Sequence, residues 1–210
     1  MNAVDILDFA GVGLFAATGA LVASRKQMDI IGFMFLATLT GIGGGTVRDL
    51  VLDVPVFWIE DHSYILICAL AAICVYFSAH LFESRYKVVL WLDAVALAAY
   101  GVFGAFKGLE ITGSPVVAVV MGMLTGTFGG ILRDVIAEEP SVLLRREVYI
   151  SAAMVGALLY VVVAGLGAPD LFAALSGFLC AFVVRSGALI MGWSLPGYRS
   201  RPGRNPEDIP

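Results

Sequence analysis

The sequence predicts an all-α membrane protein with seven transmembrane helices: two inverted three-helix repeats and a seventh helix. Hydrophobic residues make up 60% of the 210 residues and charged residues 14%, which is far from the composition of soluble domains. One motif also occurs twice. Residues 39–49 read LTGIGGGTVRD and residues 124–134 read LTGTFGGILRD, identical at seven of eleven positions and offset by 85 residues. The chain is therefore an internal duplication of mostly apolar sequence.

Apolar segments of membrane-spanning length follow one another along the chain. Crossing about 30 Å of hydrocarbon takes roughly 20 residues of helix, and short polar hinges separate segments of about that length. The predicted spans are 5–24, 30–47, 64–82, 88–106, 115–132, 147–166 and 170–192. The first repeat covers 1–82, the second covers 83–166, and 167–192 holds the seventh helix. Residues 193–210, rich in proline and arginine, are predicted to be a disordered cytoplasmic tail.

The ends of the spans are set by their polar neighbours. The N-terminus lacks a basic region and carries Asp5 and Asp8, so the first segment is predicted to be a retained span and not a signal peptide. Residues 24–29 and 83–87 are charged hinges on either side of the second and third spans. The fourth and fifth spans are separated by residues 108–114, and no loop is long enough to hold a soluble domain.

The cations predict the orientation. In the predicted topology, the side reached after the first, third, fifth and seventh spans carries ten of them: Arg25, Lys26, Arg85, Lys87, Arg133, Arg145, Arg146, Arg199, Arg201 and Arg204. The opposite side carries only Arg48 and Lys107. Positive charge concentrates in cytoplasmic loops, so the N-terminus is expected outside and the C-terminus in the cytoplasm. A bacterial inner membrane is the expected location.

The repeats are predicted to be inverted, because each contains three spans and the second copy therefore starts from the opposite side. Equivalent residues would then be related by an axis in the membrane plane, as in many transport proteins. This places the two motif-bearing spans face to face near the middle of the membrane.

The glycines of the motif are the first candidate site residues: Gly43, Gly44 and Gly45 in the first copy, and Gly129 and Gly130 in the second. Consecutive glycines favour a kink or break, and a break within the membrane is tolerated only where protein or water satisfies the exposed backbone. We therefore expect both segments to line a polar cavity. The alternative is that these glycines only permit close helix packing.

The ionisable residues of the motif, Arg48-Asp49 and Arg133-Asp134, are the second set of candidates. Charges at membrane depth usually face a protein interior or a water path. Asp8 and Asp93, which the same offset relates, are the expected partners of the two arginines. The alternative is a helix-terminal pair that snorkels to the interface. Arg185 is open to the same two interpretations: snorkelling, or neutralising an acid in the cavity.

Other chemistry is not indicated. Cys68, Cys74 and Cys180 lie in apolar spans at no ligand-like spacing, and the chain has only two histidines, so no metal site or cofactor is expected. The net charge of −4 gives no information about nucleic-acid binding, but the sequence has no basic face that would bind nucleic acid. No Ser–His pairing or phosphate-binding loop suggests an enzyme.

The paired glycine–Arg-Asp motifs, the arrangement of three plus three plus one spans and the outside N-terminus resemble the trimeric intracellular cation (TRIC) channel family. The bacterial branch of this family, long labelled as putative glycine transporters, is the most similar. The resemblance implies a homotrimer in the lipid bilayer with a pore within each protomer. That pore would be lined by the glycine-kinked second and fifth spans and would pass monovalent cations, chiefly potassium. The second copy departs from the first, because Phe128 stands where the first copy has Gly43.

The leading functional hypothesis is therefore a potassium-permeable channel with the candidate residues above in its ion pathway. The alternative is a secondary transporter of a small solute such as glycine or another amino acid, since inverted repeats are equally typical of carriers.

Overall fold

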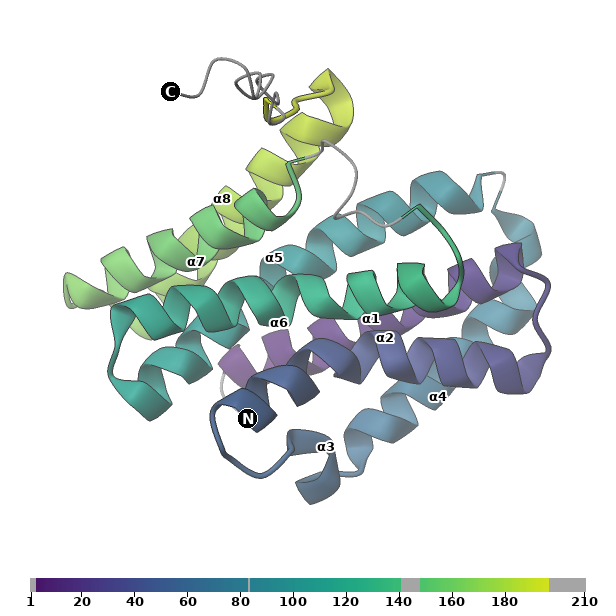
Figure 1. Cartoon of the computed structure of the whole chain (residues 1–210), viewed down its shortest axis with the longest axis horizontal. Coiled ribbons are helices and arrows are strands. Elements are labelled where there is room, and N and C mark those ends of the chain that lie inside the picture. Colours follow the sequence, from purple (N-terminus) through teal and green to yellow (C-terminus); the bar gives the residue numbers. More distant parts are fainter. Residues whose placement is uncertain (1–2, 83, 141–147, 197–210) are drawn as a thin grey trace, which may run out of the picture.

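The computed structural model describes residues 3–82, 84–140 and 148–196, and within the first helix it describes side chains from Asp8 onward. These residues are almost entirely helical (Figure 1). In chain order the helices are α1 (Ala3–Arg25), α2 (Ile30–Val51), α3 (Phe57–Glu60), α4 (Ser63–Ser78), the short 3₁₀ helix η1 (Ala79–Leu81), α5 (Arg85–Thr112), α6 (Pro115–Ile136), α7 (Ile150–Gly165) and α8 (Asp170–Met191).

Local capping chemistry sets several helix boundaries. Asp29 caps α2 by accepting a hydrogen bond of 2.8 Å from the Gly32 N–H. Ser114 caps α6 in the same way, and Pro115 occupies the first turn, where its missing N–H costs nothing. Gly113 ends α5 in the left-handed region with φ of 64°. The polar hinges of the sequence therefore act as caps and turns.

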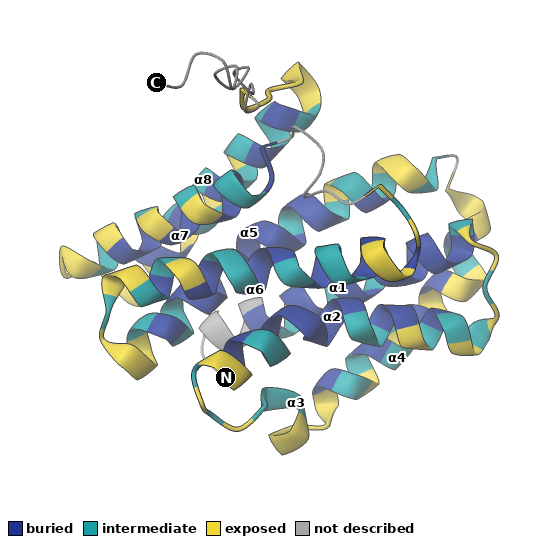
Figure 2. Ribbon diagram, in the orientation of Figure 1, coloured by how far each residue is buried: buried dark blue, intermediate teal, exposed yellow. Residues whose placement is uncertain are grey.

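Helix α5 is the centre of the bundle. It packs against α1, α6, α7 and α8, while α2 packs against α1, α4 and α6. Dark buried turns run along α5 and α1 in Figure 2, whereas α4, α7 and α8 each leave one face exposed. The two duplicated acids, Asp8 on α1 and Asp93 on α5, are consequently enclosed by other helices.

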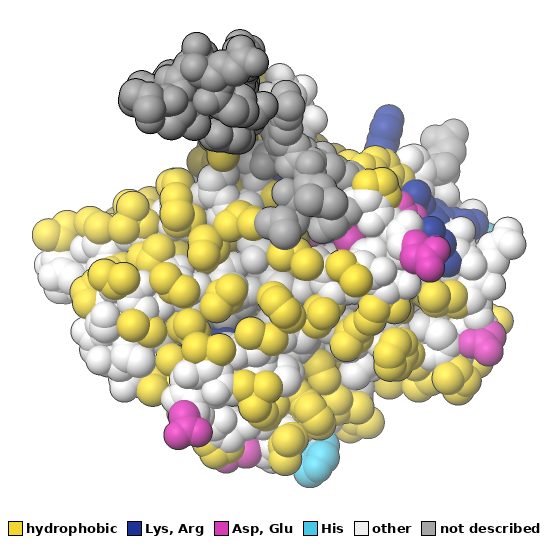
Figure 3. Space-filling model, viewed as in Figure 1, with side chains coloured by type: hydrophobic (Ala, Val, Ile, Leu, Met, Phe, Trp, Pro, Cys, Tyr) yellow, Lys and Arg dark blue, Asp and Glu magenta, His cyan; other side chains and the backbone are white. Residues whose placement is uncertain are grey.

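Among the described residues, five helices are long and apolar enough to cross a membrane: Ile30–Val51, Ser63–Leu81, Arg85–Thr112, Pro115–Ile136 and Asp170–Met191. The other two predicted spans fall on α1 and on the shorter apolar α7. Large hydrophobic side chains cover the face seen in Figure 3, and several are mostly exposed, for example Phe77 at 69% and Val116 at 74%. Such a surface matches lipid tails and not water.

Of the ten cations assigned to the cytoplasmic side, five lie outside the described residues. These are Arg145, Arg146, Arg199, Arg201 and Arg204. Most of the predicted tail, residues 197–210, lies outside them as well.

The sequence predicts a kink or a break in the glycine segments; the break is wrong, and the kink stays a prediction. Helices α2 and α6 are each continuous α-helix through their glycines. The missing side chains serve another purpose: a Cβ on Gly44 would collide with the carbonyl oxygen of Thr125, and one on Gly129 would collide with that of Thr40. The two motif copies do meet face to face, but the glycines permit a close helix crossing, which is the alternative interpretation.

We predict that Gly44→Ala lowers the free energy of unfolding by about 1–3 kcal/mol, because the added methyl group forces the backbones of α2 and α6 apart. Thermal unfolding of the purified protein in detergent measures the loss. Gly165→Ala is the matched control, since nothing lies within 4 Å of a Cβ at that helical position. Equal melting temperatures for Gly44→Ala and the control would contradict this packing role.

Candidate functional site

The first arginine of the duplicated motif, Arg48, is buried and held in one orientation. Its Nε and Nη2 both bind Asp49 Oδ1 at 2.7 Å, and Asp49 Oδ2 accepts the Phe57 N–H at 2.9 Å. The guanidinium carbon lies 5.6 Å from the centroid of the Phe57 ring and 5.1 Å from that of Phe103. Arg48 is only 2% exposed, so the snorkelling interpretation is wrong for this residue.

Asp8, the predicted partner of Arg48, has a different hydrogen-bond partner. Its Oδ2 accepts a hydrogen bond from the Tyr64 hydroxyl, and no direct ion pair with Arg48 forms. Tyr64 is itself fixed, because its ring stacks on Phe9 with a centroid distance of 4.5 Å. The expectation of an Arg48–Asp8 pair was wrong: Asp49, the next residue on α2, binds Nε and Nη2 of Arg48, and Tyr64 binds Asp8.

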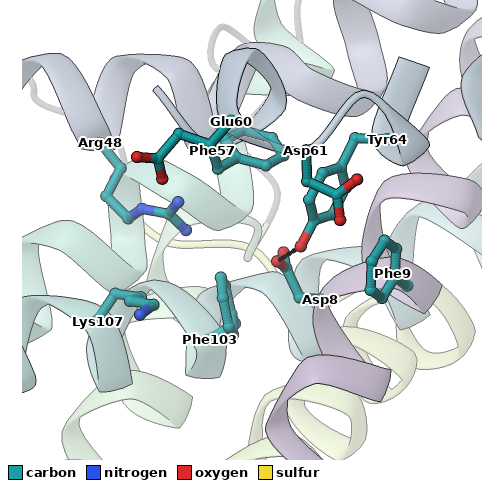
Figure 4. A pocket seen from close by; sticks show the side chains of 9 residues that line it. All are labelled: Asp8, Phe9, Arg48, Phe57, Glu60, Asp61, Tyr64, Phe103 and Lys107. Carbon is teal, nitrogen blue, oxygen red and sulfur yellow. Dashed lines mark hydrogen bonds between the residues drawn. The ribbon is translucent and has the colours of Figure 1, made fainter. Parts of the chain in front are cut away.

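Arg48 and Asp8 line a cavity of about 400 Å³, which we call the Arg48 vestibule. Its lining combines acids, cations and aromatic rings: Asp8, Glu60 and Asp61; Arg48 and Lys107; Phe9, Phe57, Tyr64 and Phe103 (Figure 4). Glu60 and Asp61 are exposed, so the vestibule reaches the protein surface. The backbone N–H of Ser63 donates to Asp61 and lowers the pKa of that carboxyl, which keeps it ionised at neutral pH.

The second arginine, Arg133, has a denser set of partners. Its Nη1 donates to Asp93 Oδ1 at 2.8 Å and to Thr18 Oγ1 at 2.9 Å. Its Nε and Nη2 bind Asp134 Oδ1 at 3.0 and 2.9 Å. The predicted pairing of Arg133 with Asp93 is therefore confirmed, and Arg133 is only 3% exposed. As with Arg48, this burial rules out snorkelling.

The cavity beside Arg133 is much smaller, about 20 Å³, which is room for about one water molecule. It is closed by an ion pair between Arg25 and Glu139 at 3.4 Å and by Tyr86, whose ring lies 5.0 Å from the Arg25 guanidinium carbon. The two copies of the motif therefore differ in accessibility.

The remaining predicted site residues lie at the helix crossing or beneath the two clusters. Gly43, Gly44 and Gly129 are at the crossing of α2 and α6, where a Cβ on Gly43 would come within 3.9 Å of the Gly129 Cα. Gly45 faces the Phe57 ring and Gly130 faces the Tyr149 hydroxyl. Arg185 does not snorkel either. It is 1% exposed, and its guanidinium carbon lies 5.0 Å from the centroid of the Tyr149 ring.

The sequence reasoning missed several contact residues, among them Phe57 and Tyr64, and two others that it missed are related by the repeat offset. Phe103 flanks Arg48, and Thr18 binds Arg133; the two are separated by the repeat offset, since 18 plus 85 is 103. Each arginine thus contacts the first helix of the other repeat, at equivalent positions. Comparing unlike residues at this offset, and not only identical ones, would have found them.

These features define a polytopic helical membrane protein whose duplicated halves each bury an Arg-Asp motif. A family model described as "Glycine transporter" matches the chain twice, over residues 5–80 and 90–165, the same offset of 85 residues. Among curated proteins, a UPF0126 membrane protein of Vibrio cholerae is 37% identical over 203 residues, covering 92% of this chain and 82% of the relative. The UPF0126 inner membrane protein YadS of Escherichia coli is 32% identical over 198 residues, covering 91% and 94%.

Solved structures are also similar to this chain in fold and sequence. The TRIC trimeric intracellular cation channel orthologue from Rhodobacter sphaeroides is 48% identical and superposes with a TM-score of 0.89, covering 92% of this chain and all (100%) of that chain. A second structure, described under conductance through TRIC cation channels, is 28% identical with a TM-score of 0.84, covering 96% and 100%. The chain belongs to the TRIC channel family, in its bacterial branch.

We predict that Asp93→Ala lowers the free energy of unfolding by about 3–5 kcal/mol, because it leaves a buried guanidinium short of one carboxylate. Thermal unfolding in detergent again provides the measurement. Glu110→Ala is the control, since the Lys107–Glu110 pair is exposed and its loss should cost less than about 1 kcal/mol. A similar loss in both variants would mean that the Arg133 cluster contributes no more than a surface pair.

Proposed function

We propose that this protein is a channel for monovalent cations, potassium among them, with one pore within each subunit of a homotrimer. The observation that carries the proposal is the Arg48 vestibule, a cavity of about 400 Å³ that leads from the surface to buried charges in an apolar bundle. Ionisable side chains at membrane depth are rare and mark pathways for ions or substrates.

The charge balance of the vestibule favours cations. Arg48 is neutralised by Asp49, and Lys107 by Glu110 at 2.9 Å. The acids Asp8, Glu60 and Asp61 remain, and none of them forms an ion pair with another described residue. A mouth with this surplus of negative charge concentrates cations before they enter.

The proposed route continues from the vestibule towards the Arg133 cluster. Asp8 and Thr18 are ten residues apart on α1, so the two clusters lie about 15 Å apart along that helix. The glycines at the crossing of α2 and α6 bring these two helices together, which would place Arg48 and Arg133 along the same route. The small cavity beside Arg133 and the Arg25–Glu139 pair would form its narrow end.

The proposed membrane arrangement has seven spans, with residues 1–82 and 83–166 as inverted repeats and residues 167–192 as the seventh helix. Its support is that residues 85 positions apart occupy equivalent places in the two clusters. Asp8 corresponds to Asp93 and Tyr64 to Tyr149, and Phe103 and Thr18 make reciprocal contacts with the two arginines. We propose an outside N-terminus and a cytoplasmic C-terminus in a bacterial inner membrane.

The named structural relatives support the ion and the assembly. One is described as a trimeric intracellular cation channel orthologue, and another under conductance through TRIC cation channels. The decisive experiment is a planar-bilayer recording of the purified protein in a potassium gradient. We expect a current that reverses near the potassium equilibrium potential. An absence of current at every voltage, with saturable counterflow of labelled glycine in liposomes, would support the carrier instead.

We predict that the double variant Glu60→Gln with Asp61→Asn lowers the single-channel potassium conductance at low salt, by about twofold for each charge removed. The difference should disappear near 1 M salt, where the screening length is only about 3 Å. Asp53→Asn is the matched control, because it removes an exposed acid from the same loop region without lining the Arg48 vestibule, and asparagine tolerates its φ of 54°. If the variant lowered the conductance equally at low and high salt, these acids would not act by attracting cations to the route.

A further inference from the structure

Two buried charged atoms of opposite sign line the Arg48 vestibule without a hydrogen-bond partner among the described residues. They are Nη1 of Arg48 and Oδ1 of Asp8, on side chains whose residues are 2% and 4% exposed. Leaving ionised atoms unpaired at such depth is costly. We propose that the vestibule binds a small zwitterionic amino acid, with its carboxylate on Arg48 and its ammonium group on Asp8.

The contacts that hold the two side chains use their other atoms, namely Nε and Nη2 of Arg48 and Oδ2 of Asp8, so Nη1 and Oδ1 are left for the cavity. Arg48 is held by Asp49 and flanked by the rings of Phe57 and Phe103, while Asp8 is held by the Tyr64 hydroxyl. In Figure 4 the Arg48 side chain lies apart from Asp8, which sits beside Tyr64, and both residues line the same cavity. A ligand that bridges them must therefore carry both a donor and an acceptor.

A single ion meets only half of this requirement. A cation on Asp8 gains nothing from Arg48, and an anion on Arg48 faces the surplus acids Asp8, Glu60 and Asp61. A zwitterion pairs with both atoms and adds no net charge. The cavity of about 400 Å³ is within the range of small-molecule sites, and the stacked rings of Phe9 and Tyr64 offer a face to an ammonium group.

The second motif copy serves as an internal comparison. All three nitrogens of the Arg133 guanidinium are engaged, by Asp93, Thr18 and Asp134, and the adjoining cavity is only about 20 Å³. The same Arg-Asp motif therefore leaves a binding site in the first copy and a closed ion-pair cluster in the second. We expect one ligand per chain.

This inference rests on the geometry of the vestibule and not on conduction. It shares the cavity with the proposed ion route, so a bound amino acid would occupy the mouth of the channel and reduce the current. Binding can be measured without recording any current, and current can be recorded without any amino acid. Failure of one proposal is therefore distinguishable from failure of the other.

The test is calorimetry and thermal stabilisation of the detergent-purified full chain with glycine as the probe, beside acetate and methylamine. Glycine should bind and raise the melting temperature, whereas acetate and methylamine, each carrying one charge, should bind at least about tenfold more weakly. Asp8→Asn keeps the size of the side chain and an acceptor for Tyr64, and should lower glycine affinity by at least about tenfold, as should Arg48→Gln. Asp53→Asn, which removes an exposed acid outside the cavity lining, should bind glycine as the wild type does.

Three results would overturn the inference: no stabilisation by glycine at millimolar concentration, equal stabilisation by acetate or methylamine, or unchanged glycine affinity in Asp8→Asn. If Arg48→Gln does not fold, the comparison of Asp8→Asn with Asp53→Asn is sufficient on its own.

Discussion

The pairing of two buried arginines with carboxylates is the interaction on which the rest of the structure depends. A guanidinium enclosed by apolar helices is stable only if carboxylates or aromatic faces replace its lost hydration. Both arginines meet this requirement first through the aspartate that follows them in sequence. Adjacent residues on a helix point in different directions, so each arginine must fold back along its own helix to reach that carboxylate. The remaining guanidinium surface then faces the opposite repeat, at Phe103 or Thr18.

The glycines of the motif make this pairing possible by bringing α2 and α6 together. Because Gly44 packs on the Thr125 carbonyl and Gly129 on the Thr40 carbonyl, the two helices cross with almost no side chains between them. Arginine and glycine in the motif are thus two parts of one arrangement. The glycines set the distance between the repeats, and that distance decides which groups of the other repeat each arginine can contact.

Much of this organisation was predictable from the sequence, since hydrophobic run length and the 85-residue offset locate the helices and identify the ionisable residues of both clusters. The partner of Arg133 was predictable as well. Local sequence does not determine whether a run of glycines breaks a helix or allows a close helix crossing, because both are compatible with the same residues. The packing of α2 on α6 determines which of the two occurs. The partner of Asp8 was also not predictable, since Tyr64 reaches it from a distant helix.

Two contacts distinguish the clusters: Asp93 pairs with Arg133 whereas Asp8 accepts from Tyr64, and the equivalent positions 18 and 103 hold unlike residues. Thr18 gives Arg133 a hydroxyl oxygen to bind, so that its Nη1 has two partners, and the adjoining cavity is small. Phe103 gives Arg48 a ring face, which attracts the cation but accepts no conventional hydrogen bond, so Nη1 stays without a partner among the described residues. A duplication with two identical halves would have two equivalent clusters. These two differences instead make one cluster structural and leave the other able to bind an exogenous group.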